Sequence, residues 1–256
     1  MSAGLAMAAI LLIAPLVRAD QRTLFPTQDN TLFEDAAGSA SNGAGPGLFV
    51  GQTHAAPVRS VRRALLHFDI AAILPAGAQV DSVWLLMTLT RTIDPNPTTV
   101  TLHKVQANWG EGTSNSGGGK LGGGGGAPAA TGDATWLHRF FSTQTWTMPG
   151  GDYEPAPSGQ AVIGNATAIG QRFTWASQPG MIADVQAWLD VPATNFGWIL
   201  IGDETVTPGV PTARRLASRE APIEADRPQL VVAYSGVGIE PRTWSRVKAL
   251  FRGTTR

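Results

Sequence analysis

The stretch that decides the fold is RALLHFDIAAILPAGAQVDSVWLLMTLTRT, residues 63–92. It contains two mainly apolar segments, Arg63–Ile70 and Gln79–Thr90, which are separated by a loop with Pro75 and Gly77. Successive side chains of a β-strand point to opposite faces. In the first segment we therefore expect one face to pack inward and the other to be at least half exposed to water. The inward face carries Ala64, Leu66, Phe68 and Ile70, and the other carries Arg63, Leu65, His67 and Asp69.

The second segment, Gln79–Thr90, is apolar on both faces. Alternate positions carry Val83, Leu85, Met87 and Leu89, whereas the opposite face carries Val80, Trp84 and Leu86. A strand that is apolar on both faces is typical of the middle of a sheet with packing on each side. The sequence therefore predicts a central, covered strand.

Other short segments share this strand-like composition and are bounded by Gly, Pro, Asn or Asp. Together with the two above, the predicted strands are Thr31–Glu34, Leu48–Gly51, Arg63–Ile70, Gln79–Thr90, Thr99–Val105, Thr135–His138, Gln171–Trp175, Gly197–Ile201, Ala213–Ser218 and Gln229–Tyr234. One internal stretch, Gly180–Asp190, instead has helical spacing, and it is flanked by Pro179 and Pro192. One helix among so many strands favours an antiparallel sheet, since parallel strands need a crossover for each pair. We predict an all-β, jelly-roll-like sandwich with one short helix.

The chain divides into three regions. Residues 1–19 contain the apolar run AMAAILLIAPLV and a Val17-Arg18-Ala19 end, which is typical of a cleaved secretory signal. Residues 20–235 carry all the predicted strands and form one expected domain, in which the Gly-rich residues 112–134 are a flexible surface loop. Residues 236–256 are a basic tail with Trp244, Val247 and Phe251 at helical spacing, which suits docking on a cell surface or partner.

Composition excludes several classes of function. The chain has no cysteine, so it has no disulfide and no thiolate site. Lys+Arg and Asp+Glu are 19 each, whereas nucleic-acid-binding proteins usually carry a basic excess. Apart from the N-terminal run, which is shorter than the ~20 residues of a membrane-spanning helix, no apolar stretch could cross a bilayer. We therefore expect an extracellular or cell-surface protein without a transmembrane segment or a nucleic-acid partner.

Catalytic motifs are weak in this sequence. The four histidines lack zinc-site spacing, and the glycine-rich segment does not match a phosphate-binding loop. Carboxylate pairs, such as Glu111 with Asp133 and Asp152 with Glu154, could act in a glycosidase, but no spacing selects one pair. We expect no enzymatic activity and no cofactor. The sequence pairs Asp29-Asn30 and Glu34-Asp35 leave two interpretations open, a structural calcium ion or the capping of turns.

Aromatic residues give the best indication of a binding function. Trp109, Trp136, Trp146 and Tyr153 lie in or near predicted loops. Flat aromatic faces pack against sugar rings, while polar side chains at the rim pair with hydroxyl and carboxylate groups. Tryptophan is also a large core residue, and for any single one of these tryptophans the sandwich interior is favoured over a ligand contact.

Several motifs resemble those of the DNRLRE domain family. Arg63–Thr92 has the family's strand ending in F-D, its P-x-G-A loop and its following x-S-x-x-L strand, and VTLHKVQANWGEGTSNS has its W-x-E-G hallmark. The opening QDNTLFED with LFVG, the ATWLHRF and FTW segments, and the closing SREAP with RPQLVVAY also fit, so that the resemblance covers about Leu24–Tyr234. It implies a secreted β-sandwich module. Related sequences are classed as carbohydrate-binding module family 96, which is associated with acidic polysaccharides such as alginate.

We therefore expect a secreted, non-catalytic module that binds an extracellular polysaccharide, with an acidic polysaccharide as the narrower expectation. Trp109 and Trp136 are the expected stacking residues. His138, Arg139, Arg215 and Arg219 are expected to contact hydroxyl or carboxylate groups, and Glu111 and Glu220 are expected to orient these cations. Arg219 and Glu220 could instead stabilise the fold by pairing with loop backbone. Two alternative functions stay open: a structural or adhesive surface protein docked through its C-terminal tail, and a polysaccharide lyase or hydrolase.

Overall fold

The computed structural model describes residues 19–53, 60–117, 123–205 and 211–236. In these ranges α2 (Pro179–Asp190) is the only helix longer than four residues. The other helical elements are α1 (Ile70–Ile73) and the 3₁₀ turns Ala166–Ala168, Pro192–Thr194 and Glu224–Asp226. The strands are β1 (Asp20–Leu24), β2 (Gln28–Phe33), β3 (Ala40–Ser41), β4 (Gly47–Thr53), β5 (Ser60–His67), β6 (Gln79–Thr92), β7 (Thr98–Lys104), β8 (Ala127–Pro128), β9 (His138–Phe140), β10 (Gln144–Thr145), β11 (Gly159–Ile163), β12 (Arg172–Trp175), β13 (Trp198–Ile201), β14 (Arg214–Ala217) and β15 (Gln229–Ser235).

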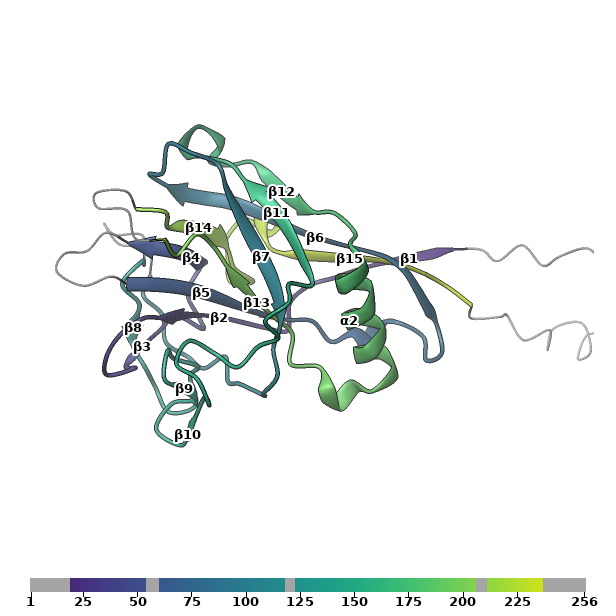
Figure 1. Ribbon diagram of the computed structural model, residues 1–256, viewed down its shortest axis with the longest axis horizontal. Coiled ribbons are helices and arrows are strands. Elements are labelled where there is room, and N and C mark those ends of the chain that lie inside the picture. Colours follow the sequence, from purple (N-terminus) through teal and green to yellow (C-terminus); the bar gives the residue numbers. More distant parts are fainter. Residues whose placement is uncertain (1–18, 54–59, 118–122, 206–210, 237–256) are drawn as a thin grey trace, which may run out of the picture.

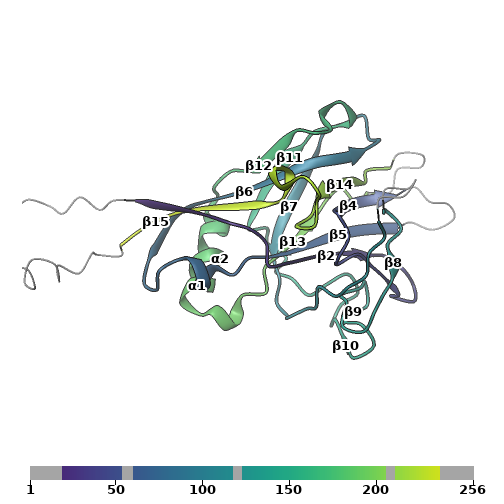
Figure 2. The same ribbon diagram turned by 180° about the vertical axis from the view of Figure 1, so that it is seen from behind.

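Eleven strands form one antiparallel sheet that curls over on itself (Figure 1). One part contains β12, β6, β15 and β1, and Figure 2 shows β1 running alongside β15 at its edge. The other part contains β2, β4, β5, β13, β7 and β11, and β14 joins the two parts by pairing with both β6 and β4. This architecture confirms the predicted antiparallel β-sandwich with one sizeable helix.

The main core lies inside the curl. The inward faces of both parts are fully buried there, including Leu66 of β5 and Leu85 of β6, as period two predicts. Helix α2 adds Met181, Val185 and Trp188 to the same core, and the Trp188 ring lies 4.7 Å from the Trp198 ring, centroid to centroid. The helix therefore buries its apolar stripe against the sheet, as its spacing predicts.

A second apolar cluster covers the outer face of β5 and β13. Leu65 and Ile199 are fully buried there beneath Trp109 and Trp146, which come from the long segment after β7. The expectation that the Leu65 face of β5 is at least half exposed is therefore wrong for this residue. Figure 1 shows the covering segment, with β9 and β10, beside β2 and β5 and away from β6.

Three other local expectations differ from the structure. Strand β5 ends at His67, because the side chain of Asp69 accepts a hydrogen bond from Ala72 N and caps α1. The predicted strand Thr135–His138 is shifted, since β9 begins only at His138. Strand β6 is central, but Trp84 and Leu86 on its second face are only partly buried rather than covered.

Hydrogen bonds to Asp133 tie together the described residues at the two ends of the Gly-rich segment. Asp133 is fully buried, and its carboxylate accepts hydrogen bonds from the backbone N–H groups of Thr113 and Ala130 and from the Ser114 hydroxyl. Strands from before and after this segment join the same sheet. Among the described residues, no helix has the length and hydrophobicity to cross a membrane. The predicted signal sequence, apart from Ala19, and nearly all of the predicted basic tail lie outside the described residues.

Candidate functional site

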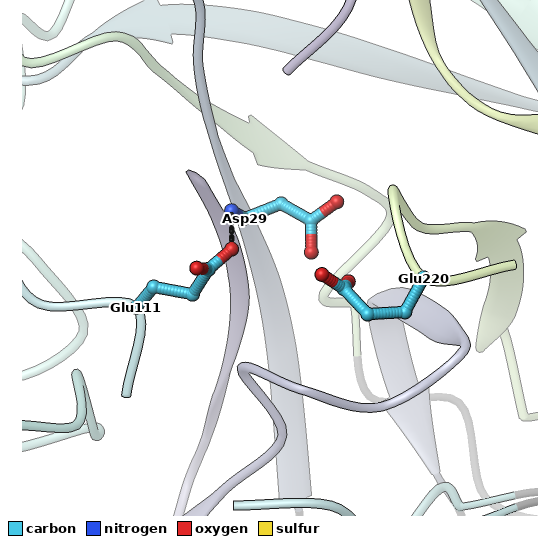
Figure 3. A group of neighbouring side chains, drawn as sticks. All are labelled: Asp29, Glu111 and Glu220. Carbon is cyan, nitrogen blue, oxygen red and sulfur yellow. Dashed lines mark hydrogen bonds between the residues drawn. The ribbon is translucent and has the colours of Figure 1, made fainter. Parts of the chain in front are cut away.

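An acidic cluster lies where three distant segments meet (Figure 3). Asp29 comes from β2, Glu111 from the loop after β7 and Glu220 from the turn after β14, and each offers a carboxylate oxygen within 4.8 Å of the other two. Arg219 contacts all three: its backbone N–H donates to Asp29 Oδ2 (2.7 Å), and its Nη1 lies 2.8 Å from Glu111 Oε1 and 2.9 Å from Glu220 Oε1. Three carboxylates and one guanidinium give this cluster a net charge of −2 when all are ionised.

Asn30 fixes the position of Glu111. Its side chain is fully buried, and its Nδ2 donates to the backbone carbonyl of Glu111 at 2.7 Å and to that of Ala134 at 3.3 Å. Its Oδ1 accepts from Asn42 N at 3.0 Å. The backbone N–H of Asp29 then donates to Glu111 Oε1 at 2.9 Å. The start of β2 therefore holds both the backbone and the side chain of Glu111.

Gly112 allows the chain to turn directly after Glu111. Its φ is +75°, and a Cβ at this position would lie 1.4 Å from Asp133 Oδ1. Only glycine combines this backbone conformation with the absence of a side chain. The Glu-Gly order of the sequence motif therefore has a physical reason: the glutamate enters the cluster, and the glycine makes room for the buried aspartate.

Burial perturbs the cluster electrostatically. Burial, followed by the charge of Glu220, raises the pKa of Asp29 well above its usual value. Burial also raises the pKa of Glu220, against the opposing effect of Arg219. Burial alone would lower the pKa of Arg219, but its hydrogen bonds to Glu111 raise it overall. Asp29 Oδ1 and Glu220 Oε2 are both buried without a hydrogen-bond partner, so the cluster is incomplete as it stands.

A groove on the outer face of β4, β14 and β6 carries two neighbouring arginines. We call it the Arg91–Arg215 groove; its volume is about 330 Å³. Arg215 is the cross-strand partner of Arg91 on one side and of Phe49 on the other, so the three form a row across the sheet. No carboxylate is among the described residues that line it: Phe49, Thr53, Arg91, Thr92, Ile93, Gly124, Pro211, Ala213, Arg214 and Arg215.

Hydrogen bonds fix the Arg215 side chain, but no carboxylate of the described residues forms an ion pair with it. Its Nη2 donates to the Pro46 carbonyl at 3.0 Å and its Nη1 to Thr90 Oγ1 at 3.3 Å, while its Nε is buried without a partner. Burial and the nearby charge of Arg91 lower the pKa of Arg215. Arg214, the next residue, differs because its Nη1 lies 3.1 Å from Asp94 Oδ2. The groove therefore presents a positive pair that the described carboxylates leave uncompensated.

A second groove, of about 890 Å³, lies beside Tyr153. Arg63 lies between aromatic rings there, 5.0 Å from the Trp136 ring and 5.4 Å from the Tyr153 ring, and its Nε is 2.7 Å from Glu204 Oε1. The cation in this groove is therefore already paired. We call it the Tyr153 groove; its polar lining includes His103, Gln106 and Asp152.

The stacking role predicted for Trp109 is wrong. Its side chain is 1% exposed, lies in the second apolar cluster, and donates its indole N–H to the Phe196 carbonyl at 2.9 Å. A sugar ring cannot reach either face of this indole. Trp136 is partly exposed, but the Arg63 guanidinium occupies one face of its ring.

The other predicted contact residues do not form one site. His138 is partly exposed and its Nδ1 lies 3.2 Å from Thr135 Oγ1, while Arg139 Nη1 is 3.4 Å from the Asn108 carbonyl. Both belong to β9, whereas Arg215 lies on β14 in the Arg91–Arg215 groove. Glu111, Arg219 and Glu220 come together in the acidic cluster, where both glutamates contact the arginine.

Most of the remaining carboxylates named from the sequence have structural partners. Asp133 anchors the Gly-rich flanks, Asp152 accepts hydrogen bonds from two backbone N–H groups, and Glu154 accepts one from Gln106. Asp35 accepts from the N–H groups of Ala37 and Ser39, which is the turn-capping arrangement. None of these carboxylates is part of the acidic cluster.

Arg91 is the main binding candidate that sequence reasoning missed. Strict alternation in β6 would place it on the same face as Leu89, in the core. A β-bulge intervenes: Leu216 pairs with Leu89 but Arg215 pairs with Arg91, so that Thr90 is an extra residue. The bulge turns Arg91 outward beside Arg215. The polar run Thr90-Arg91-Thr92 at the end of an apolar strand was the available signal.

No protein-family model and no curated protein matches this chain.

Proposed function

We propose that this chain is an exported, non-catalytic module that binds an acidic polysaccharide in the Arg91–Arg215 groove. The observation that carries the proposal is the cross-strand pair of arginines without a carboxylate between them. Like charges directly opposite one another destabilise a sheet. A bound uronate carboxylate would offset that repulsion, since guanidinium groups pair with carboxylates through charge-assisted hydrogen bonds.

The shape and lining of the groove support the same function. It is open on the surface, and its apolar lining includes Ile93, which is 70% exposed, and the buried Phe49. Apolar lining with a few placed polar groups is typical of ligand sites. The resemblance of the sequence to the DNRLRE domain family, with its association with acidic polysaccharides, points in the same direction.

Affinity measurements with matched polymers test this proposal. By isothermal titration calorimetry, the purified protein should bind a polyuronate such as alginate and should not bind a neutral glucan. Arg91→Gln should weaken polyuronate binding about tenfold, which corresponds to the loss of one hydrogen bond to a charged group. Arg91 is exposed and has no side-chain hydrogen bond or ion pair with the described residues, so this variant should fold normally.

The control is Arg22→Gln, which removes an exposed cation from β1 at the far edge of the sheet. It should bind as the unmodified protein does, and added salt should weaken binding because screening reduces the attraction. Equal affinity for the neutral polymer, or full affinity in Arg91→Gln, would overturn the proposal. Loss of binding in Arg139→Gln with Arg91→Gln unaffected would also refute it and would place the site near β9.

A further inference from the structure

The acidic cluster has two buried oxygen atoms without a partner. Asp29 is fully buried, yet its Oδ1 has no hydrogen-bond partner. Glu220 is only partly buried as a residue, but its Oε2 atom is buried and also has no partner. Figure 3 shows the carboxylates of Asp29 and Glu220 facing one another. Two carboxylates in this arrangement need a proton or a cation between them, because a buried charge without a partner strongly destabilises a fold.

Arg219 does not supply that group. Its Nη1 contacts the Glu111 carboxylate and Glu220 Oε1, and its backbone N–H donates to Asp29 Oδ2. Neither Asp29 Oδ1 nor Glu220 Oε2 receives a hydrogen bond from it. With all three carboxylates ionised the cluster carries a charge of −2, which one divalent cation would neutralise. The three side chains offer only carboxylate oxygens, a ligand set that suits hard cations such as Ca²⁺ and Mg²⁺ better than zinc or copper, which favour nitrogen or sulfur ligands.

The three carboxylates are close enough to share one cation, and their chemistry favours calcium. Calcium accepts irregular sets of carboxylate oxygens at about 2.3–2.6 Å, whereas Mg²⁺ demands near-ideal octahedral geometry and usually keeps several waters. The three carboxylates offer oxygens that all lie within 4.8 Å of one another. We infer that Asp29, Glu111 and Glu220 bind one calcium ion, which ties β2 to the loop after β7 and to the turn after β14.

This site is independent of the proposed polysaccharide site. None of its carboxylates lines the Arg91–Arg215 groove or the Tyr153 groove. Its expected role is structural, because an ion that joins three distant segments stabilises the folded state by mass action.

Calcium titration of chelator-treated protein at pH 7 tests the inference. Millimolar CaCl₂ should raise the thermal midpoint by at least about 2 °C and give a saturable heat in calorimetry. Asp29→Asn retains the shape of the side chain but removes a charged ligand, so its calcium affinity should fall at least tenfold. Glu220→Gln should show the same loss and serves if Asp29→Asn does not fold. Glu154→Gln removes a carboxylate outside the cluster and should respond as the unmodified protein does.

Three outcomes would overturn the inference. The first is no calcium-dependent change in midpoint and no heat in the unmodified protein, which would indicate that Asp29 and Glu220 share a proton instead. The second is binding of Mg²⁺ as tight as that of Ca²⁺. The third is an unchanged calcium response in both Asp29→Asn and Glu220→Gln.

Discussion

Replacing Arg91 by glutamate should raise the stability of the fold and abolish the binding of polyuronates. Arg91 and Arg215 are directly opposite in the β6–β14 ladder, and the described residues place no carboxylate beside them. A cross-strand pair of opposite charges contributes roughly 0.2–1 kcal/mol, and a like-charge pair opposes folding by a similar amount. Because Arg91 is exposed, solvent screening keeps the expected gain for Arg91→Glu to about 0.5–1 kcal/mol. For a domain of this size the thermal midpoint should rise by about 1–4 °C.

The same substitution should abolish binding of polyuronates, since the groove would then carry a carboxylate of its own. Thermal or urea denaturation measures the first effect and calorimetry with alginate measures the second. Arg91→Gln should give an intermediate stability, and 1 M salt, where the Debye length is about 3 Å, should remove most of the difference between the variants. The reasoning fails if Arg91→Glu is less stable than the unmodified protein at low salt, or if it keeps its polyuronate affinity.

Three further substitutions test the assignments made above. Trp109→Phe should lower the free energy of unfolding by about 2–3 kcal/mol, because it leaves a small cavity and an unpaired Phe196 carbonyl; polyuronate affinity should not change, and a loss of affinity at unchanged stability would contradict the core assignment. Asn30→Ala should cost about 2–4 kcal/mol in urea denaturation, because it leaves the Glu111 carbonyl and the Asn42 N–H without their buried partner; a loss below about 1 kcal/mol would contradict this. Burial lowers the pKa of His67 from its usual 6.5, so the folded protein favours the neutral ring, and the stability that this contributes is present above pH 6.5 and lost as pH falls through the lower folded pKa. His67→Gln should therefore show a smaller loss of stability than the unmodified protein between pH 7 and 5, and parallel curves would refute the assignment.

Alternation of apolar residues was sufficient to predict the core because it reflects local geometry. Leu66, Leu85 and Leu89 follow period two within their strands, and the stripe of α2 follows a period of 3.6. These patterns depend only on how side chains leave a regular backbone. The fold class and the helix therefore followed from the sequence without knowledge of any long-range contact.

The second apolar cluster could not be predicted in this way. Leu65 appeared half exposed because the segment that covers it, with Trp109 and Trp146, lies far along the chain and has no regular period. Irregular segments bury residues according to where the chain returns to the sheet, and this return is a tertiary property. For the same reason the sequence predicts that Trp109 stacks on a ligand, although its side chain lies in this cluster.

The position of the candidate site residues depends on strand register, which the sequence does not show either. A single bulged residue, Thr90, decides whether Arg91 faces the core or the groove. From the sequence we expect Glu111, Arg219 and Glu220 among eight ligand contacts, whereas Asp29 is grouped with Asn30, Glu34 and Asp35 as a calcium candidate. Pairing between distant strands and loops, rather than proximity in sequence, brings Asp29 to Glu220.

Both candidate sites differ from the ion pairs formed elsewhere among the described residues. Arg214 is buried and pairs with Asp94, and Arg63 pairs with Glu204. By contrast, Arg215 faces Arg91, and Asp29 faces Glu220. Folding alone would favour an opposite or neutral side chain at one position of each pair, because buried or adjacent like charges oppose folding. Local conflicts of this kind are expected where a sequence serves a ligand rather than stability. The two pairs carry opposite charges, so their ligands must also be opposite in charge. The arginine pair needs an anion, and the carboxylates need a cation. A polyuronate would therefore bind without displacing the calcium ion, and the two ligands should show additive effects on the thermal midpoint.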